Sequence, residues 1–330
     1  MAMTISGDNG LTFPAGSTQV QAGNFQTMVN RIINPRMEID QRNAGASVTV
    51  NGNAPYTLDR WRAQDLTDGI FTVQQDAGAV TPPAGFTAYL GVTTTTADSS
   101  LGASQVARVF QSIEGFNVAD LGWGTANAKT VTLSFWVRSS LTGSFGGSLL
   151  NGSDNRAYPF SYTISSANTW EQKSVTIAGD TSGTWNTTNS TGIVLIFGLG
   201  IGSTFSGTAG AWAGSELYAP TGSVSVIGTL NATWYITGVD LRVGSYTVVP
   251  QDFRAYGTEL ALCQRYYTKS TATYTVLSSD NMFVDFKTTM RATPTITVSA
   301  GTVSGGAYTG VDYFRITGNT DFTWTSSAEL

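Results

Sequence analysis

Trp136 and Arg138 are the residues whose types and spacing best fit ligand chemistry. They stand two positions apart in the segment VTLSFWVR at 131–138. Because an extended strand points alternate side chains to opposite faces, both project from the same face. Trp offers a flat apolar surface to the C–H groups of a sugar, and Arg offers fixed donors to hydroxyls or uronates. The pattern predicts a glycan-binding surface on this strand.

Three aromatic residues on nearby predicted strands can complete that surface, namely Tyr158, Tyr162 and Trp170. The competing interpretation is that Trp136 packs against a second layer or a neighbouring chain. Large aromatic side chains are highly buried on average, which favours packing.

The side chains available for catalysis are few, because the chain has no histidine and one cysteine, Cys263. This composition excludes Ser-His-Asp and Cys-His catalysis and the common histidine metal sites. Glycoside hydrolysis needs two carboxyl groups about 5–10 Å apart in a cleft. The spacing places no such pair among the candidate carboxylates, so we expect no enzyme. These candidates are Asp59, Asp65, Glu114 and Asp120.

The composition favours a folded all-β protein. Charged residues make up 12% of the 330 residues, apolar residues 41%, and there are 37 Gly, 8 Trp, 13 Tyr and 16 Phe. A disordered chain has higher net charge and fewer aromatics.

The net charge of −5 and the lack of a basic cluster argue against a nucleic-acid partner. No apolar run reaches the roughly 18 residues that membrane insertion needs. The opening residues lack a secretory pattern, so we expect synthesis and folding in a cytoplasm.

The elements that must position these residues are short strands separated by turns. The strand pattern runs through residues 31–252 without a helical period, which predicts a two-sheet sandwich or jelly roll. This region is longer than one sandwich requires, so we expect the additional residues to form long loops at 140–156 and 201–225. Residues 269–330 predict a small C-terminal β domain, and residues 1–30 a Gly/Ser/Thr-rich attachment arm with one or two short strands. The predicted strands lie at 47–52, 70–75, 87–96, 106–113, 131–138, 158–164, 170–179, 191–200 and 232–243.

One helical segment, at 253–268, links the two β units. Leu260, Cys263 and Tyr267 fall at helical spacings, which predicts a helix from about Gly257 to Tyr267. Its apolar stripe can pack on the sandwich or against the same helix in two other chains.

Several runs of the sequence resemble a family of tail-fibre and related virion proteins of tailed bacteriophages, cyanophages included. The resemblance covers roughly residues 30–267, and both ends of the chain are similar to the ends of such fibres. The runs include NRIINPRMEIDQRN at 30–43, YTLDRWR at 56–62, QSIEGFNVADLGWGTANAKTVTLSFWVRSSLTG at 111–143, YPFSYTISSANTWEQKSVTIAGDTSGTW at 158–185, YITGVDLRVGS at 235–245 and YGTELALCQRYY at 256–267.

The resemblance implies a jelly roll like a carbohydrate-binding module, set in a homotrimeric virion appendage that touches the host surface. The expected partners are two further copies of the chain, other tail or baseplate proteins through residues 1–30, and host envelope polysaccharide. The expected location is the virion tail. No loop carries a motif that matches a known sugar specificity, so the sequence does not identify the receptor sugar.

The resemblance also implies a possible cofactor, because similar jelly rolls often hold a structural calcium ion near their first and last strands. Glu38 and Asp40 near the start and Asp240 near the end are the candidate ligands. Calcium takes several oxygen ligands from carboxylates and backbone carbonyls. Turn capping by solvated carboxylates is the commoner role of such residues.

Taken together, these features predict a phage tail fibre that attaches to host glycans. The alternative is a capsid decoration or baseplate adaptor protein that binds no glycan.

Overall fold

The computed structural model describes residues 28–52, 54–247, 253–276, 281–317 and 320–330, and the backbone of three short strands before them. These strands form a small antiparallel sheet. They are β1 (Thr4–Ser6), β2 (Gly10–Thr12) and β3 (Thr18–Gln19). Most of the predicted attachment arm, residues 1–30, lies outside the described residues, and its role stays a prediction.

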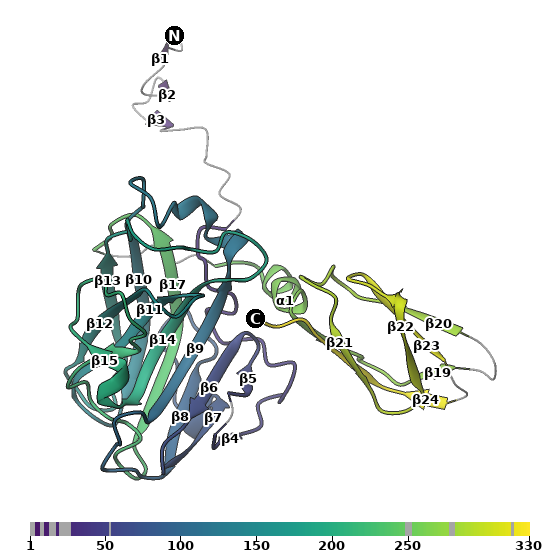
Figure 1. Ribbon diagram of the computed structural model, residues 1–330, viewed down its shortest axis with the longest axis horizontal. Coiled ribbons are helices and arrows are strands. Elements are labelled where there is room, and N and C mark those ends of the chain that lie inside the picture. The colour runs from purple at the N-terminus through teal and green to yellow at the C-terminus, as the bar shows by residue number, and fades with distance from the viewer. Residues whose placement is uncertain are drawn as a thin grey trace.

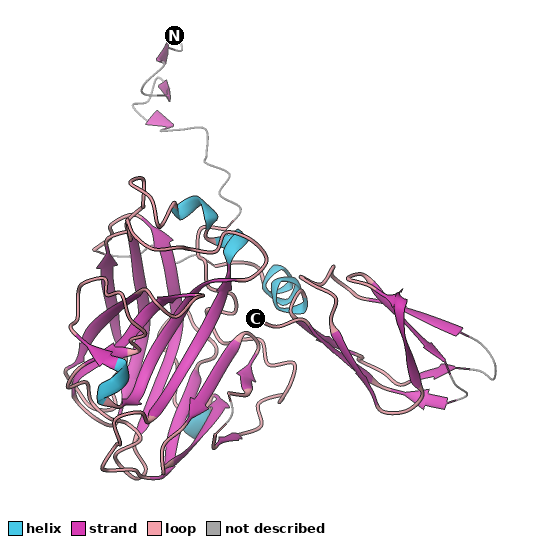
Figure 2. Ribbon diagram, viewed as in Figure 1, coloured by secondary structure: helices cyan, strands magenta, loops and turns pink. Residues whose placement is uncertain are grey.

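The larger part of the chain is a sandwich of two six-stranded antiparallel sheets (Figures 1 and 2). This confirms the predicted all-β jelly roll. The first sheet has the order β13-β10-β17-β8-β7-β4. Its strands are β4 (Val48–Val50), β7 (Ile70–Gln75), β8 (Leu90–Thr96), β10 (Val131–Ser139), β13 (Glu171–Ile177) and β17 (Thr233–Val243).

The second sheet has the order β12-β11-β14-β9-β6-β5. Its strands are β5 (Tyr56–Leu58), β6 (Trp61–Asp65), β9 (Val106–Glu114), β11 (Gly143–Asn151), β12 (Ala157–Ile164) and β14 (Thr191–Ile201). A long segment after β14 holds two short parallel strands, β15 (Ser206–Gly207) and β16 (Ala219–Pro220).

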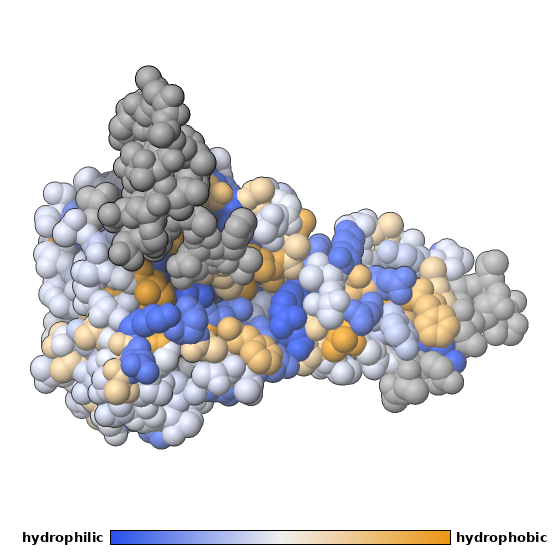
Figure 3. Space-filling view, turned by 90° about the horizontal axis from the view of Figure 1, so that it is seen from above, coloured by the Kyte–Doolittle hydropathy of each residue, from blue (hydrophilic) through white to orange (hydrophobic). Residues whose placement is uncertain are grey.

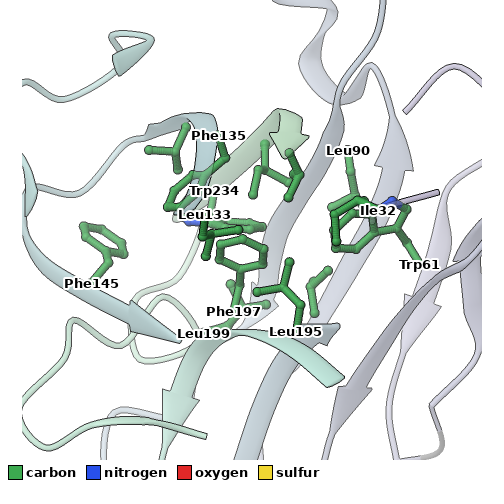
Figure 4. Close-up of a cluster of buried hydrophobic side chains, with 14 of the residues drawn as sticks. Ile32, Trp61, Leu90, Leu133, Phe135, Phe145, Leu195, Phe197, Leu199 and Trp234 are labelled. Carbon is green, nitrogen blue, oxygen red and sulfur yellow. The ribbon is translucent and has the colours of Figure 1, made fainter. Parts of the chain in front are cut away.

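The core lies between the two sheets. The inward face predicted for VTLSFWVR is confirmed, because its four apolar side chains are fully buried: Val131, Leu133, Phe135 and Val137. Phe135 meets Phe197 of β14 edge to face, with ring centroids 5.0 Å apart (Figure 4). The alternation of β10 therefore fixes which face of the first sheet meets the second.

Strand β11 corrects the prediction of a loop at 140–156. Its glycines resemble turn residues in the sequence, yet Gly146 and Gly147 lie inside the sheet, paired with β12. A Cβ on Gly146 would collide with Pro220, and a Cβ on Gly147 with the Ile196 carbonyl oxygen. These glycines permit a close approach of neighbouring segments, which is a long-range requirement invisible in the local pattern.

The helix α1 (Tyr256–Gln264) is shorter than predicted. Tyr267 belongs instead to β18 (Tyr267–Lys269), where it pairs with Ser327. Pairing with a strand from the far end of the chain overrides the local helical spacing. Buried Cys263 packs in a small cluster with Ile33, so the helix packs on its own sandwich. In the part of the chain described, no helix has the length and apolarity needed to cross a membrane.

The C-terminal β domain has its own small core and three sheets, with the orders β18-β25-β21, β19-β24 and β20-β23-β22. Its core residues are Val284, Phe286, Met290, Phe314, Ile316, Phe322, Trp324 and Ala328. The strands after β18 are β19 (Tyr274–Val276), β20 (Asn281–Asp285), β21 (Thr295–Val298), β22 (Thr302–Thr309), β23 (Tyr313–Thr317), β24 (Thr320–Phe322) and β25 (Trp324–Ser327). The end of the chain returns to the sandwich beside α1 (Figure 1).

Candidate functional site

The predicted aromatic surface is divided between the two sheets. Trp136 and Arg138 lie on β10, and Trp170 lies one residue before β13, all on the first sheet. Tyr158 and Tyr162 lie on β12 of the second sheet. The structure therefore does not bring the five residues together as one surface.

Trp136 is half-buried and lies beside Gly238 of β17. The left-handed Gly238 next to it has no room for a side chain, since a Cβ there would lie 2.6 Å from the Phe86 ring and 3.3 Å from the Trp136 ring. The buried indole nitrogen of Trp136 has no hydrogen-bond partner among the described residues. The rings of Phe86 and Trp136 thus flank the same glycine, and the Trp136 side chain is half-buried rather than open to solvent, as the packing interpretation expects.

Arg138 and Trp170 are likewise engaged within the chain. Arg138 Nε donates to the Asn168 carbonyl at 2.9 Å, and Trp170 Nε1 donates to the Thr81 carbonyl at 2.9 Å. The Trp170 ring also meets Tyr89 at 5.5 Å between centroids. Loop residues of the chain itself hold these two side chains in place.

Tyr162 is a core residue. Its hydroxyl accepts a 3.0 Å hydrogen bond from Trp234 Nε1, and burial raises the pKa of the Tyr162 phenol. Tyr158 is also buried and meets the Trp212 ring edge to face at 5.2 Å. Neither side chain is available as an open stacking surface.

The three predicted calcium ligands serve separate contacts. Asp40 accepts hydrogen bonds from the backbone of Asn43 and Gly45, which caps a turn. Glu38 accepts from the Thr87 hydroxyl, and Asp240 pairs with Arg242. Within the described ranges, no group of three or more carboxylate, cysteine or histidine side chains is arranged to hold a metal ion.

The four carboxylates weighed for hydrolysis are also dispersed. Asp59 accepts from Gln41, and Asp65 accepts from the Thr67 hydroxyl at 2.6 Å. Glu114 accepts from Arg265 and from the Tyr266 hydroxyl, whereas Asp120 pairs with Arg31. Each carboxylate has a structural partner of its own.

Asp59 gives a testable pH dependence, because burial raises the pKa of its carboxyl group to about 6 from an ordinary 3.8. A raised pKa in the folded state adds stability below about pH 4 that is lost as the pH rises through about 6. The free energy of unfolding of the wild type, minus that of Asp59→Asn, is expected to fall by about 2–3 kcal/mol between pH 4 and pH 7. Urea unfolding at unit pH steps measures it, and a constant difference would contradict the prediction.

A groove of about 290 Å³ lies on the outer face of the second sheet. Strands β6, β9, β11 and β14 supply its floor, and the segments at 152–154 and 216–218 supply its wall. The residues that line it are Ala54, Arg62, Gln64, Arg108, Phe110, Ser112, Leu150, Gly152, Asp154, Thr191, Val194, Glu216, Tyr218 and Leu330. This volume is at the lower end of the roughly 300–1,000 Å³ range of small-molecule sites.

Strand periodicity positions the polar floor of the groove. On β6, Arg62 and Gln64 point outward while Ala63 between them is buried in the core. On β9, Arg108 likewise points outward, and it lies opposite Gln64 in the antiparallel register. Arg108 Nε donates to Gln64 Oε1 at 2.9 Å, which fixes the orientation of the guanidinium group.

Arginines and aromatic rings alternate along this face. The Arg62 guanidinium lies 5.3 Å from the Tyr56 ring centroid and 5.1 Å from that of Phe110. The Arg108 guanidinium lies 4.7 Å from the Phe110 centroid and 4.0 Å from that of Tyr218. Such cation–π contacts hold planar guanidinium groups in fixed positions. We call these five residues the arginine ladder.

The wall of the groove is acidic. Burial and the nearby Glu216 carboxylate raise the pKa of Asp154, and burial raises the pKa of the Tyr218 phenol. The Tyr218 hydroxyl donates a short hydrogen bond to Glu216. The groove thus offers fixed N–H donors on its floor and carboxylate acceptors on its wall, which suits a ligand rich in hydroxyl groups.

The residues of this groove are not among those predicted from the sequence as a binding site. The alternating segments WRAQD at 61–65 and VARVFQSI at 106–113 carry its floor. On the outward face, the first segment carries Arg62 and Gln64, and the second carries Arg108 and Phe110. An arginine at an outward strand position beside another polar or aromatic residue is a sequence signal that could have indicated this site. The wall carboxylates Asp154 and Glu216 lie more than 40 positions after Arg108 in the sequence, and no local pattern connects them to the two arginines of the floor.

Comparisons with known proteins give structural likeness only. No protein-family model matches the chain, and no curated protein matches it. Similar solved structures include a protein described as sugar-binding from Bacteroides thetaiotaomicron, with 12% identity and a TM-score of 0.39 over 65% of this chain and 100% of that one. The module TmCBM61, solved with beta-1,4-galactotriose, is 11% identical with a TM-score of 0.33 over 65% of this chain and 99% of that one.

A third similar structure is the enzymatically active domain of tailspike protein 4 of bacteriophage CBA120. It is 11% identical with a TM-score of 0.34 over 65% of this chain, and the match spans 21% of the tailspike chain. Identities and scores at this level transfer neither ligand nor activity.

Proposed function

We propose that this chain is a tail-fibre protein of a bacteriophage virion, and that its jelly roll binds host-surface glycans in the groove of the second sheet. The groove carries the proposal: it combines oriented donors, Arg62 and Arg108, with carboxylate acceptors, Asp154 and Glu216, around a space of about 290 Å³. Sugar hydroxyls need both kinds of partner. The residue runs that resemble tail-fibre proteins support the virion context.

The proposal includes a homotrimer attached to other tail or baseplate proteins through residues 1–30. Three grooves on one appendage can engage one polysaccharide together. Multivalent engagement raises the overall affinity well above that of a single site. A small groove with weak single-site binding is therefore sufficient for attachment.

Filling the groove provides the test. Val194 on β14 points into the groove, and Val194→Trp is expected to block it and lower polysaccharide binding at least tenfold. The matched control is Thr176→Trp, which adds an indole at an exposed position of β13 on the opposite sheet. Co-migration of envelope polysaccharide with each protein in size-exclusion chromatography measures binding.

The outcomes separate the two candidate roles. Co-migration with the wild type and with Thr176→Trp, lost in Val194→Trp, supports glycan attachment through the groove. If the polysaccharide migrates separately from every protein, glycan attachment is wrong, and the decoration or adaptor role becomes the better account. Equal binding by all three proteins would place the glycan elsewhere on the chain.

A further inference from the structure

The groove contains two arginines, Arg62 and Arg108, that form no ion pair with a carboxylate in the described part of the chain. We infer that it selects glycans that carry an anionic group, such as a uronate carboxylate, and that Arg62 and Arg108 bind this group. The inference rests on the proposed function, because it names the class of glycan that the same groove takes.

The first observation is that neither arginine forms an ion pair, although the Asp154 and Glu216 carboxylates lie in the same groove. Most arginines of this chain lie within 4.0 Å of a carboxylate oxygen, for example Arg156 with Asp180 at 2.7 Å. Across the described part of the chain, no carboxylate oxygen lies that close to a nitrogen of Arg62 or Arg108. The ion pairs formed by other residues are those of Arg31, Arg36, Arg42, Arg60, Lys129, Arg156, Lys173, Arg242, Arg254 and Arg265.

The second observation is the orientation of the two guanidinium groups. Arg62 donates through Nε to the Ala54 carbonyl at 3.0 Å, and Arg108 donates through Nε to Gln64 at 2.9 Å. Both inner nitrogens are thereby occupied, and the terminal nitrogens of each group have no ion-pair partner in the described chain. A guanidinium group held in this way matches the geometry of a carboxylate, sulfate or phosphate.

The third observation is the separation of the two arginines. Gln64 pairs with Arg108 and Arg62 pairs with Phe110, so the arginines are diagonal neighbours on β6 and β9. Diagonal neighbours on one face of an antiparallel pair are about 7–8 Å apart. An anion that lies between two arginines at this spacing can accept hydrogen bonds from both guanidinium groups. Burial lowers the pKa of Arg108, and the nearby Tyr218, Glu216 and Asp154 offset part of this shift without forming an ion pair with it.

The aromatic rings of the groove point to the same class of ligand. Phe110 has Arg62 and Arg108 near its ring, whereas Tyr218 stacks on Phe205 at 4.9 Å and also contacts Arg108. Both rings are buried. A neutral sugar therefore finds no open aromatic face for stacking, and charge-assisted hydrogen bonds become the main source of affinity.

The acidic wall limits where the anion can lie. Asp154 and Glu216 repel a second anionic group and accept hydrogen bonds from hydroxyls. The preferred ligand thus directs its anionic group toward Arg62 and Arg108 of the arginine ladder and its hydroxyl groups toward the acidic wall. The net charge of −5 on the whole chain opposes anionic polymers, so the attraction is local to this groove.

A glycan array containing matched acidic and neutral sugars tests the inference. The pairs are galacturonate with galactose oligomers, glucuronate with glucose oligomers, and sulfated or phosphorylated sugars with their unmodified forms. The full-length protein is expected to bind acidic members at least tenfold better than their neutral partners. Comparison of the carboxylated, sulfated and phosphorylated groups identifies which anion is preferred.

Variants locate the anion. Arg62→Gln and Arg108→Gln are each expected to weaken binding of the acidic glycan by about 10- to 100-fold, the value of a charge-assisted hydrogen bond. The matched control is Arg138→Gln, which removes an arginine without an ion pair from the opposite sheet and is expected to leave binding unchanged. Arg108→Lys keeps the charge but loses the planar fork, and is expected to weaken binding as well.

Each outcome has a distinct meaning. Neutral glycans that bind as tightly as their acidic partners, with this binding lost in Val194→Trp, would overturn the anionic preference while leaving the proposed function in place. Acidic binding that is unchanged in both arginine variants would also overturn the inference. The absence of binding to any glycan would contradict the proposed function itself. The array profile of the wild type stands even where a variant fails to fold.

Discussion

Replacement of Glu329 by glutamine is expected to lower the free energy of unfolding by about 3–5 kcal/mol, because it leaves the buried Arg60 guanidinium without its carboxylate. The side chain of Arg60 is 1% exposed and that of Glu329 is 7% exposed. Glu329 also accepts a 2.9 Å hydrogen bond from Arg42. The Tyr266 ring covers Arg60 at 3.6 Å, so water has little access to the stranded charge.

The same residue connects the two β domains. Glu329 follows β25 of the C-terminal domain, whereas Arg42 and Arg60 belong to the sandwich. The next residue, Leu330, accepts a hydrogen bond from Tyr56 and lines the groove. Figure 3 shows hydrophilic and hydrophobic residues side by side on the described surface where the two domains meet. Loss of the Glu329 charge is therefore expected to loosen the docking of the domains.

Urea unfolding followed by tryptophan fluorescence measures the effect. The control is Lys129→Gln, which removes a partner of Asp120 at 3.9 Å where both side chains are more than 40% exposed. Such a surface pair contributes at most about 1 kcal/mol. A Glu329→Gln variant as stable as Lys129→Gln would show that this buried network does not stabilise the fold.

Tyr162→Ala is expected to lower the free energy of unfolding by about 3–5 kcal/mol through the cavity that it leaves in the core. The Tyr162 ring packs against Phe135 and Phe145, at 5.0 and 5.8 Å between centroids. Its hydroxyl is the acceptor for Trp234 Nε1. Tyr162→Phe keeps the ring but leaves the buried Trp234 donor unpaired, which is expected to cost about 1–3 kcal/mol.

Thermal and urea unfolding of the two variants measures these losses in the free energy of unfolding. A larger loss for Tyr162→Ala than for Tyr162→Phe is expected if Tyr162 is a core residue. Sugar binding by folded Tyr162→Phe should equal that of the wild type, because the hydroxyl points into the core. If Tyr162→Phe lost glycan binding at unchanged stability, the role of Tyr162 as a core residue would be wrong.

The fold was largely predictable because alternation is local. The alternation within VTLSFWVR predicts a strand with Phe135 on its buried face. No information from another part of the chain is needed for that prediction. The glycine-rich β11 was not predictable, since Gly147 is required by the Ile196 backbone on another strand. Likewise, helix α1 ends early because Tyr267 pairs with Ser327, 60 positions away.

The groove was less predictable for the same reason. Periodicity shows that Trp136 leaves the core face of β10, but not that Gly238 and Phe86 lie beside it. It also shows that Arg62 and Arg108 point outward, but not that their strands are neighbours. Two sequence-distant strands must pair before these arginines become one site, and that pairing depends on the whole jelly roll.

Hydrogen–deuterium exchange of the protein with and without envelope polysaccharide tests the central claim most directly, because it shows where the glycan lies. The account predicts slower exchange in the loops at 152–156 and 214–218, which contain the wall of the groove, and no change in the loop at 81–87, whose Thr81 accepts a hydrogen bond from Trp170. Protection confined to 81–87 and 131–138, with the groove loops unchanged, would contradict it.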